Sequence, residues 1–464
     1  MADPNPSRDP LVANVDVTVV KPLQKTAHVE SIEPSFVDVS FADLYVPVMF
    51  AYRLASNTNE AYSQALKRIK DGLQKVLVPY FTFAGRWIPN GGSRERSLLC
   101  NDAGVPFIEA FVDQNMDDVM QFNLEFDAIP ELHGYGSVGM DFKVLMQPMP
   151  AGGQPPAFAQ VTRFKCGGLV VAVNFNHMHT DLNGFCTFMT AWSEVSRGNA
   201  VKEEDYDRKQ VHVPALANID QEVQDRMDGR EEDSYATRSW VMKSWEVSAS
   251  AIKSVKQEAK EVKDGPGFVS TQDCIAAHVL CGMARIPPSV IRGKEPRITI
   301  AAEGRRRFFD PPLSKEYTGN CISPVLPARV PGKELAEMPV ASVACGIRQQ
   351  LESIKTEEWM GEKRWKAFFG EFASGDSVVI SITSAFKTPM YEIDFGFGKP
   401  VFARRVSALW NYSRPDLFIG TAAIAAPAPS DSSSCVAVLS VFGLPEVLQA
   451  LESDPIFLSL FAPQ

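Results

Sequence analysis

Residues 169–185 read LVVAVNFNHMHTDLNGF and join a strand pattern to a group of reactive side chains. The almost continuous apolar run ends at Asn176, as is typical of a strand buried on both faces. After it come His177, His179 and Asp181, and then Asn183-Gly184, which signals a turn or the start of a helix. Because α/β folds place reactive groups where a strand ends in such a turn, the stretch predicts this fold class and a candidate site.

Strand and helix patterns alternate along the rest of the chain. Strand-like runs lie at 47–52, 159–164, 298–302, 378–383 and 436–442. Apolar residues recur at helical spacing over 62–78, 182–196, 248–262, 271–285, 334–355 and 444–452. This mixed order of strands and helices predicts an α/β architecture.

The length of the chain and one charged segment predict its domain organisation. The chain has 464 residues, of which 45% are hydrophobic and 22% charged, so it holds enough apolar material for more than one packed core. Residues 202–235 are rich in charge with few apolar positions, which is typical of a surface linker. We therefore expect an N-terminal domain at 1–201 and a C-terminal domain at 236–464.

Charge and cysteine usage narrow the classes of function. The formal net charge is −10 and no run of five basic residues occurs, which argues against nucleic acid and anionic membranes as partners. The first residues lack a signal-peptide pattern, and no apolar run is long enough to span a membrane. The eight cysteines form no CxxC pair, which favours a reducing compartment, and we expect the cytoplasm.

Three interpretations of the HxxxD pattern stay open from the residues alone. His177 could act as a general base, since the ordinary pKa of histidine lies near working pH, with Asp181 bracing the local structure. His177, His179 and Asp181 could instead alternate along an extended strand and bind a metal. They could also be hydrogen-bonded residues without a chemical role.

Two further segments favour structural roles. Residues 391–400, YEIDFGFGKP, predict a tight turn in which Gly396 and Gly398 take positive φ and Asp394 caps the turn. Residues 298–308, ITIAAEGRRRF, place Arg305 just after a strand, where its planar guanidinium could pair with a buried carboxylate.

Together and in this order, the segments resemble the BAHD acyltransferase family. HMHTDLNG (177–184) and DFGFG (394–398) match its HxxxDG and DFGWG motifs. LVPYFTFAGRW (77–87), AAEGRRRF and YTGNC support the match, which runs from about residue 17 to the C-terminus. Within the family, the chain is similar to hydroxycinnamoyl-CoA:amine transferases of the agmatine coumaroyltransferase type.

The resemblance implies two chloramphenicol-acetyltransferase-like domains, with mixed sheets flanked by helices and an active-site channel between them. It implies transfer of an acyl group, hydroxycinnamoyl or another aromatic one, from acyl-CoA to an amine, with His177 as base and no acyl-enzyme. Acyl-CoA would be a co-substrate, with no metal and no cofactor. A monomeric plant enzyme of specialised metabolism is implied.

The resemblance also assigns supporting residues. Asp181 would pair with Arg305, and Asp394, Gly396 and Gly398 would form a structural loop away from the chemistry. Lys256, Ser270 and Thr271 fall where relatives approach CoA, and Ala385 stands where many relatives place a tryptophan in the acceptor pocket. Leu182 and Phe397 depart from the motifs, and Leu182 puts the turn after Asp181 in question.

Other functions remain as alternatives. An O-acyltransferase would use the same chemistry on a hydroxyl acceptor and give an ester, and a non-catalytic homologue would bind acyl-CoA only. A metalloenzyme would use the two histidines and Asp181. A protonated amine would be helped by an acidic group near the channel, for which Glu33, Asp38 and Asp43 are candidates by position.

Overall fold

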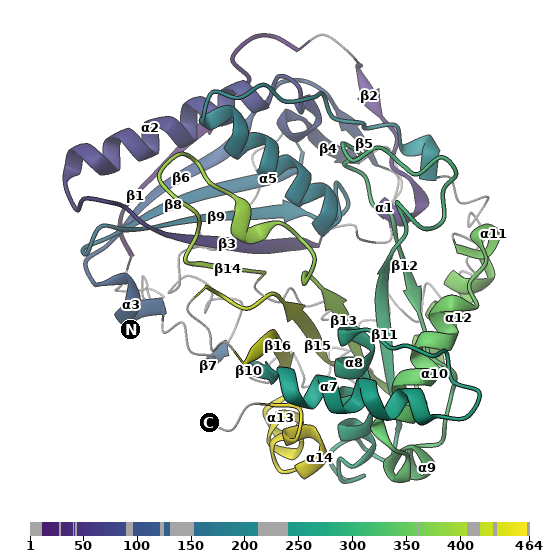
Figure 1. Ribbon diagram of the computed structural model, residues 1–464. Helices are drawn as coiled ribbons and strands as arrows, with labels where there is room; N and C mark the ends of the chain where they lie inside the picture. Colours follow the sequence, from purple (N-terminus) through teal and green to yellow (C-terminus); the bar gives the residue numbers. More distant parts are fainter. Residues whose placement is uncertain are drawn as a thin grey trace, which may run out of the picture.

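Two large β-sheets with helices outside them, and one small sheet, make up the computed structural model of this chain (Figure 1). The structure describes residues 12–26, 29–39, 41, 44–89, 96–120, 125–129, 153–211, 240–359, 362–405, 418–429 and 434–461. The α/β class predicted from the sequence is confirmed by this arrangement.

The first sheet is formed mainly by the N-terminal half of the chain. Its strands lie in the order β1 (Val12–Val20), β6 (Val105–Val112), β8 (Ala157–Phe164), β9 (Gly168–Asn176), β3 (Tyr45–Arg53) and β14 (Phe402–Arg405). β9 is buried along its whole length, as its apolar sequence predicts. It pairs with β3 in an antiparallel register that sets Asn176 opposite Tyr45, so the end of β9 is fixed by its neighbour.

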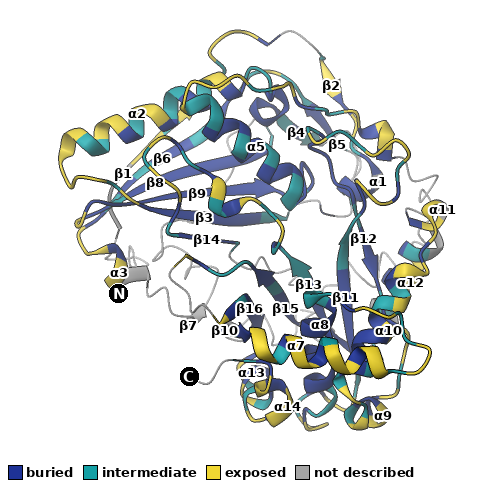
Figure 2. Cartoon of the chain, in the orientation of Figure 1, coloured by how far each residue is buried: buried dark blue, intermediate teal, exposed yellow. Residues whose placement is uncertain are grey.

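Helices α2 (Asn59–Val76) and α5 (Leu182–Ser196) pack together on this sheet (Figure 1). Thr58 caps α2 by accepting a hydrogen bond from the Ala61 amide, and the buried stripe of α2 faces inward while its other side is exposed (Figure 2). The indole of Trp192 in α5 donates to the Ile69 carbonyl of α2 at 2.9 Å.

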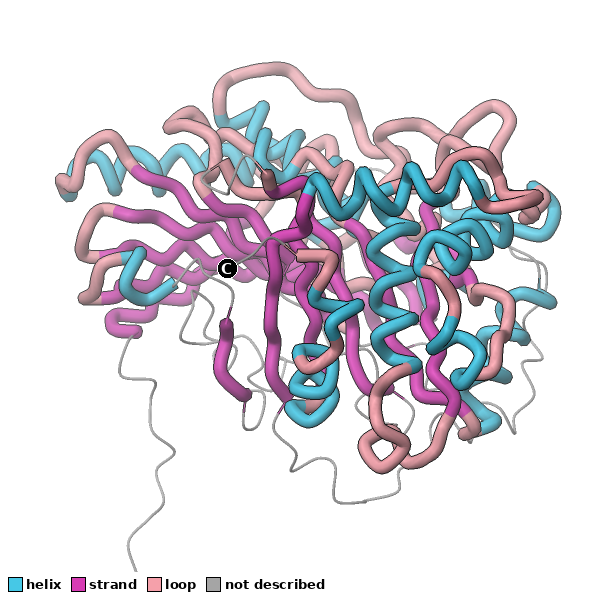
Figure 3. Tube along the Cα trace, turned by 60° about the horizontal axis from the view of Figure 1, so that its bottom comes forward, coloured by secondary structure: helices cyan, strands magenta, loops and turns pink. Residues whose placement is uncertain are grey.

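The second sheet is formed mainly by the C-terminal half. Its strands lie in the order β12 (Ile322–Val325), β11 (Glu295–Glu303), β13 (Ser377–Ser384), β15 (Phe418–Ala425), β16 (Cys435–Gly443), β10 (Trp240–Ser248) and β7 (Glu125–Ile129). Helices lie along one face of it (Figure 3), among them α7 (Ala249–Glu258), α8 (Thr271–Ala284), α10 (Val340–Glu352), α13 (Pro445–Glu452) and α14 (Pro455–Leu458). α8 is buried along nearly all of its length, so it forms the centre of this hydrophobic core.

Shorter elements complete the described chain. A small sheet contains β2 (Ser31–Ile32), β5 (Arg96–Leu99) and β4 (Arg86–Pro89). The remaining helices are α1 (Phe36–Val39), α3 (Met116–Met120), α9 (Gly332–Glu337), α11 (Thr356–Trp359), α12 (Glu362–Ser374), and the 3₁₀ turns η1 (Phe81–Ala84), η3 (Arg208–Val211), η4 (Ala259–Glu261) and η5 (Met390–Glu392). No helix in the described ranges is both long and apolar enough to cross a membrane.

Each half of the chain contributes a strand to the sheet of the other half. β14 pairs with β3 at the edge of the first sheet, and β7 pairs with β10 at the edge of the second. The division at 202–235 stays a proposal, and residues 212–239 lie outside the described residues. The start of that segment is not a surface linker, because Glu204 and Arg208 are buried.

Candidate active site

The chain turns sharply at the end of β9 and carries His177 away from the strand. The His177 amide donates to the Leu44 carbonyl at 2.7 Å, and the side chain of Asn176 accepts from the Met178 amide at 2.9 Å. The His179 amide donates a hydrogen bond to the Asn176 carbonyl at 2.9 Å, and this bond closes the turn. His177, His179 and Asp181 therefore lie on a turn, and the metal-site interpretation, which needed an extended strand, does not match this backbone.

The two histidines and the aspartate have separate surroundings. The Nε2 atom of His179 lies 3.2 Å from the Thr82 hydroxyl, and its buried ring packs edge-on against Phe83. Asp181 instead faces Arg305. Within the described ranges, no group of three or more histidine, cysteine or acidic side chains is arranged to hold a metal ion.

Asn320 holds the imidazole of His177. The Asn320 amide nitrogen donates to the Asp38 carboxylate at 2.7 Å and to the His177 carbonyl at 2.8 Å, so its amide oxygen faces Nδ1 of His177 at 3.2 Å. An oxygen beside Nδ1 requires the proton on Nδ1, which leaves Nε2 as the nitrogen with a free lone pair. Phe41 stacks on the ring at 4.0 Å between centroids and restricts its rotation.

His177 is neutral at physiological pH. Burial lowers the pKa of His177 to about 4. The charge of Asp181 raises this pKa, and the charge of Arg405 lowers it, but burial has the largest effect. Only the neutral form can accept a proton. The geometry therefore supplies a neutral, oriented imidazole whose Nε2 can accept a proton.

Asp181 anchors the start of α5 and the turn that carries His177. Its carboxylate accepts two hydrogen bonds from Arg305 at 2.8 Å each, which is the ion pair that the family resemblance implied. It also accepts from the Gly184 amide at 2.9 Å and the Cys321 amide at 2.8 Å. Burial alone would raise the pKa of Asp181, but Arg305 outweighs burial and the pKa is lowered, so the carboxylate stays ionised.

Leu182 does not disrupt this turn. Asp181 is the N-cap of α5 and Leu182 is its first residue. The glycine that the turn needs is Gly184, because an added Cβ there would lie 2.4 Å from the Thr180 hydroxyl and 2.5 Å from the Thr318 carbonyl.

A buried acid lies behind the turn. The Glu204 carboxylate accepts from the Thr82 amide at 2.8 Å, the Thr82 hydroxyl at 2.7 Å and the Thr318 hydroxyl at 3.1 Å. Burial raises the pKa of Glu204 to about 7 in spite of these hydrogen bonds. The sequence placed Glu204 in a charged segment, and no local signal distinguished it from its solvated neighbours.

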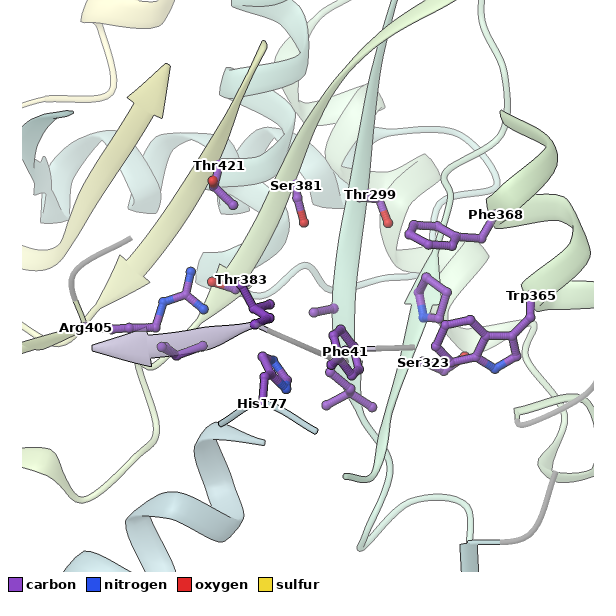
Figure 4. Close-up of a pocket in the computed structure, with 15 residues that line it drawn as sticks. Phe41, His177, Thr299, Ser323, Trp365, Phe368, Ser381, Thr383, Arg405 and Thr421 are labelled. Atoms are coloured by element: carbon purple, nitrogen blue, oxygen red, sulfur yellow. The ribbon is translucent and has the colours of Figure 1, made fainter. Parts of the chain in front are cut away.

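A pocket opens beside His177, with about 590 Å³ of empty space when the part that is open to solvent is counted. Figure 4 shows its lining, in which hydroxyl-bearing side chains of the second sheet face His177, with aromatic rings on one side and a guanidinium on the other. The described lining residues are Phe41, Leu44, Val46, His177, Thr299, Ala301, Ile322, Ser323, Pro324, Trp365, Phe368, Ser381, Thr383, Arg405 and Thr421.

Two of the positional acid candidates do not line this cavity. Asp38 is fully buried and binds the side chain of Asn320, while Glu33 accepts from the Ser97 hydroxyl at 2.7 Å. Asp43 lies outside the described residues. Sequence reasoning missed the role of Asn320 and Asp38, and the only available signal was the YTGNC segment that contains Asn320.

The DFGFG segment forms a tight loop on the first hydrophobic core. Asp394 accepts from the Gly396 amide at 2.6 Å and the Gly398 amide at 3.0 Å, and both glycines take positive φ, 94° and 108°. Arg68 of α2 donates to the Gly396 carbonyl at 2.6 Å. Phe395 is buried in the first core, and none of the loop lines the cavity within the described residues.

The expected CoA and acceptor residues lie apart from His177. Lys256 donates to the Thr271 hydroxyl at 3.0 Å, and Ser270 caps α8. These residues are on the helical side of the second sheet and do not line the cavity. Ala385 lies just after the end of β13, and its side chain packs in the first core and is not part of the described lining.

Comparisons with known proteins agree with this fold. The chain matches the family model described as the Transferase family over residues 12–421. It is 28% identical to agmatine hydroxycinnamoyltransferase 1 of Oryza sativa subsp. japonica, over 77% of this chain and 80% of the relative. It is 27% identical to omega-hydroxypalmitate O-feruloyl transferase of Arabidopsis thaliana, over 78% of this chain and 77% of the relative. The crystal structure of vinorine synthase superimposes with a TM-score of 0.71 at 20% identity, covering 97% of this chain and 98% of that one.

Proposed function

Because the chain belongs to the BAHD family of acyl-CoA-dependent acyltransferases, as the match over residues 12–421 shows, we propose that it transfers an aromatic acyl group to an amine acceptor. The donor is a hydroxycinnamoyl or similar CoA thioester, and the product is an amide. One observation carries the proposal. A neutral, oriented His177 lines a cavity whose other walls come from the second sheet and from α12.

The reaction proceeds by direct attack in a ternary complex. Nε2 of His177 takes a proton from the acceptor as the acceptor nitrogen attacks the thioester carbonyl carbon. The tetrahedral intermediate then collapses and the carbon–sulfur bond breaks. The CoA thiolate leaves with the proton from the His177 imidazolium, so the enzyme returns to its starting state with amide and free CoA as products.

Positioning supplies much of the rate acceleration. The cavity holds the thioester and the acceptor beside one base, and orientation of this kind contributes up to about 7–11 kcal/mol in well-ordered cases. Asp181 and Arg305 support this by fixing the turn that carries His177, and the loop of Asp394, Gly396 and Gly398 supports it from a distance by packing on the first core.

An aromatic donor is supported by the rings around the cavity. Trp365 and Phe368 of α12 and Phe41 of the first domain form an apolar wall. Aromatic rings favour stacked or edge-on contacts with one another beyond simple burial. The relative named as an agmatine hydroxycinnamoyltransferase is consistent with such a donor and with an amine acceptor.

A hydroxyl acceptor is the second candidate, and one observation favours it. No aspartate or glutamate is among the described residues that line the cavity, so a protonated amine would find no carboxylate there. An alcohol arrives uncharged and needs none. Acyl transfer to oxygen uses the same base and the same steps and gives an ester, and one relative is named as an O-feruloyl transferase.

We also propose where CoA lies and where the enzyme works. Lys256 and Thr271, beside the Ser270 cap, place a cation and a hydroxyl at the N-terminus of α8, a combination suited to phosphate groups. The structure leaves all eight cysteines unbridged, which supports a reducing compartment such as the plant cytoplasm. We expect the enzyme to act as a monomer.

The test is acceptor-dependent release of CoA. Purified protein is incubated with a panel of acyl-CoA thioesters and with pooled amines, alcohols and hydroxy acids, and free thiol and product mass are measured. We expect His177→Ala to lower kcat by about 10²–10⁴-fold. The matched control is His179→Gln, which changes a histidine of the same turn that does not line the cavity.

Each outcome decides one part of the proposal. Product mass distinguishes amide from ester and names both substrates. Normal turnover by His177→Ala would show that His177 is not the base. Acyl-CoA that binds but stays esterified across the whole panel would favour a non-catalytic acyl-CoA-binding protein instead.

A further inference from the structure

The second sheet has a different chemical character on each of its two faces. On the helical face, β11 and β13 place their isoleucines in the hydrophobic core: Ile298, Ile300, Ile380 and Ile382. On the opposite face, the residues that lie between them, Thr299 and Ser381, line the cavity beside His177. Because side chains alternate along a strand, this pattern places small hydroxyl groups on the cavity wall.

Three of these hydroxyls form a row across neighbouring strands. Thr299 pairs with Ser381 in the parallel register of β11 and β13, and Ser381 pairs with Thr421 in that of β13 and β15. Neighbouring strands lie about 4.8 Å apart, so the three side chains of this hydroxyl row follow one another at a regular spacing. Figure 4 shows the row opposite His177, with Thr299 closest to Phe368 and Thr421 farthest from it.

The side chains of the hydroxyl row are buried, and within the described part of the chain their hydroxyls have no hydrogen-bond partner. Thr299 is 2% exposed, Thr421 6% and Ser381 7%. Ser323 of β12 lines the same cavity, and its fully buried Oγ has no partner either. Buried polar groups in folded proteins are nearly always hydrogen-bonded, because an unpartnered one destabilises the fold. Four such hydroxyls around one cavity therefore indicate a surface whose partners come from a ligand.

The chemistry of the hydroxyl row selects the kind of ligand. A hydroxyl both donates and accepts hydrogen bonds, so a row of hydroxyls matches the hydroxyls of a ligand, which also do both. The row carries no charge, so it offers no counter-ion to a carboxylate or to an ammonium group. The rings of Trp365 and Phe368 lie beyond the Thr299 end of the row and suit the aromatic acyl group, which leaves the row itself for the acceptor (Figure 4).

We propose that the acceptor is a polyhydroxylated molecule, and that Thr299, Ser381 and Thr421 bind its hydroxyl groups while a further group of the same molecule attacks the thioester. Such acceptors are polyols if the nucleophile is oxygen, or amino polyols if it is nitrogen. The hydroxyl row holds the acceptor on the wall opposite His177, so the nucleophile is directed at Nε2, which takes its proton as the carbon–sulfur bond of the donor breaks. This inference rests on the proposed function and narrows its acceptor.

The experiment compares each polyhydroxylated acceptor with its deoxygenated analogue of the same carbon skeleton. Glycerol is paired with propanol, inositol with cyclohexanol and serinol with isopropylamine, each with coumaroyl-CoA as the donor. The variants Thr299→Val, Ser381→Ala and Thr421→Val each remove one hydroxyl of the row, and Ser381→Thr keeps it. The control is Ser244→Ala, which removes a buried hydroxyl of the same sheet that bonds to Ser440 and does not line the cavity.

For the favoured pair, we expect the native enzyme to prefer the polyhydroxylated acceptor by about tenfold or more in kcat/KM. Loss of one hydroxyl of the row should lower that value by about 3–10-fold and the value for the analogue by less than about twofold. Ser381→Thr and Ser244→Ala should keep the preference. Thr299→Val and Thr421→Val should unfold at the temperature of the native protein or above it, because they remove hydroxyls without partners, whereas Ser244→Ala breaks an internal hydrogen bond and should unfold at a lower temperature.

Equal kcat/KM for both members of every pair would overturn the inference while leaving the transferase intact. Equal losses for acceptor and analogue in the variants of the row would overturn it too, and so would unfolding of these variants at temperatures as low as that of the control, because the hydroxyls would then support the sheet. If no acceptor is acylated, the proposed function fails and calorimetry with inositol tests the row by itself. Inositol that binds the native protein but not Ser381→Ala would support the polyol site, and inositol that binds neither would overturn it.

Discussion

At the scale of single residues, the candidate base depends on a side chain that does no chemistry itself. Asn320 binds the Asp38 carboxylate, the His177 carbonyl and the His177 ring with one amide group. Asp38 decides which way the amide points, since its carboxylate can only accept a hydrogen bond. The orientation of the amide in turn decides which imidazole nitrogen carries the proton.

We expect Asn320→Leu to lower kcat by about 10–100-fold with little change in the KM for acyl-CoA, because Nδ1 loses its oxygen partner and the neutral ring is no longer held in one tautomer. With an uncharged acceptor, the kcat/KM of the native enzyme should fall only as the pH drops towards about 4, because the pKa of His177 is lowered and its imidazole stays neutral above that value. Kinetics at a series of pH values measure both effects. Asn320→Gln is the conservative comparison. An unchanged kcat and pH profile in Asn320→Leu would show that Asn320 does not position His177.

The sequence could predict the histidine of the site but not the residues that hold it. The apolar run and the HxxxD pattern are local, so they are visible in one stretch of chain. Asn320 and Asp38 meet across 282 residues, and Arg405 reaches the cavity only because β14 joins the first sheet. Contacts of this kind are set by tertiary packing, which leaves no periodic signal in the sequence.

At the scale of elements, the turn and helix after β9 act as one unit. α5 begins directly after Asp181 and spans Leu182–Ser196, the range that its apolar spacing predicted. The β9 strand was equally predictable, because its pattern is long and continuous. β14 was not predicted, because four residues at the edge of a sheet carry too short a pattern and depend on pairing with β3.

Gly184 sets how closely this unit packs against the loop that contains Asn320. An added Cβ would meet the Thr180 hydroxyl at 2.4 Å and the Thr318 carbonyl at 2.5 Å, so the turn and the loop would have to separate. We expect Gly184→Ala to destabilise the protein by about 1–3 kcal/mol and to lower kcat, because the base and its amide partner move apart.

Urea unfolding measures the change in stability, and Gly346→Ala is the matched control. Gly346 lies in α10, with no atom within 4 Å of an added Cβ, so the same substitution there should be neutral or stabilising by up to about 1 kcal/mol. A Gly184→Ala protein as stable and as active as the native one would show that the close contact does not position the site.

At the scale of the whole molecule, the site joins the two halves of the chain. His177 and Asp181 follow the central strand of the first sheet, whereas Arg305 follows β11 of the second and Asn320 precedes β12. The Asp181–Arg305 ion pair bridges the halves, and the exchange of β14 and β7 ties them again at the sheet edges. The geometry of the candidate base is therefore a property of the assembled molecule and not of either half alone.

Removing one partner of the Asp181–Arg305 ion pair should destabilise the protein strongly. Arg305→Met leaves the Asp181 carboxylate ionised and buried without its counter-charge, and we expect a loss of about 3–5 kcal/mol in the free energy of unfolding. Asp181→Asn should lose less, since it still offers an oxygen to the Gly184 or Cys321 amide. The double variant Asp181→Asn/Arg305→Met should lose less than the sum of the two single changes, because no charge is left unpaired.

Urea unfolding of the four proteins gives this coupling energy, and acyl-CoA binding is measured on the same samples. Arg329→Met is the control, because it breaks a pair whose arginine is half exposed and should cost less than about 1 kcal/mol. We expect kcat to fall in Arg305→Met while acyl-CoA affinity changes little, since Arg305 holds the turn of His177 and does not line the cavity. A loss of stability in Arg305→Met no greater than that of the control would mean that the two halves are held together elsewhere. A selective loss of acyl-CoA binding would mean that Arg305 binds the donor and does not hold the turn of His177.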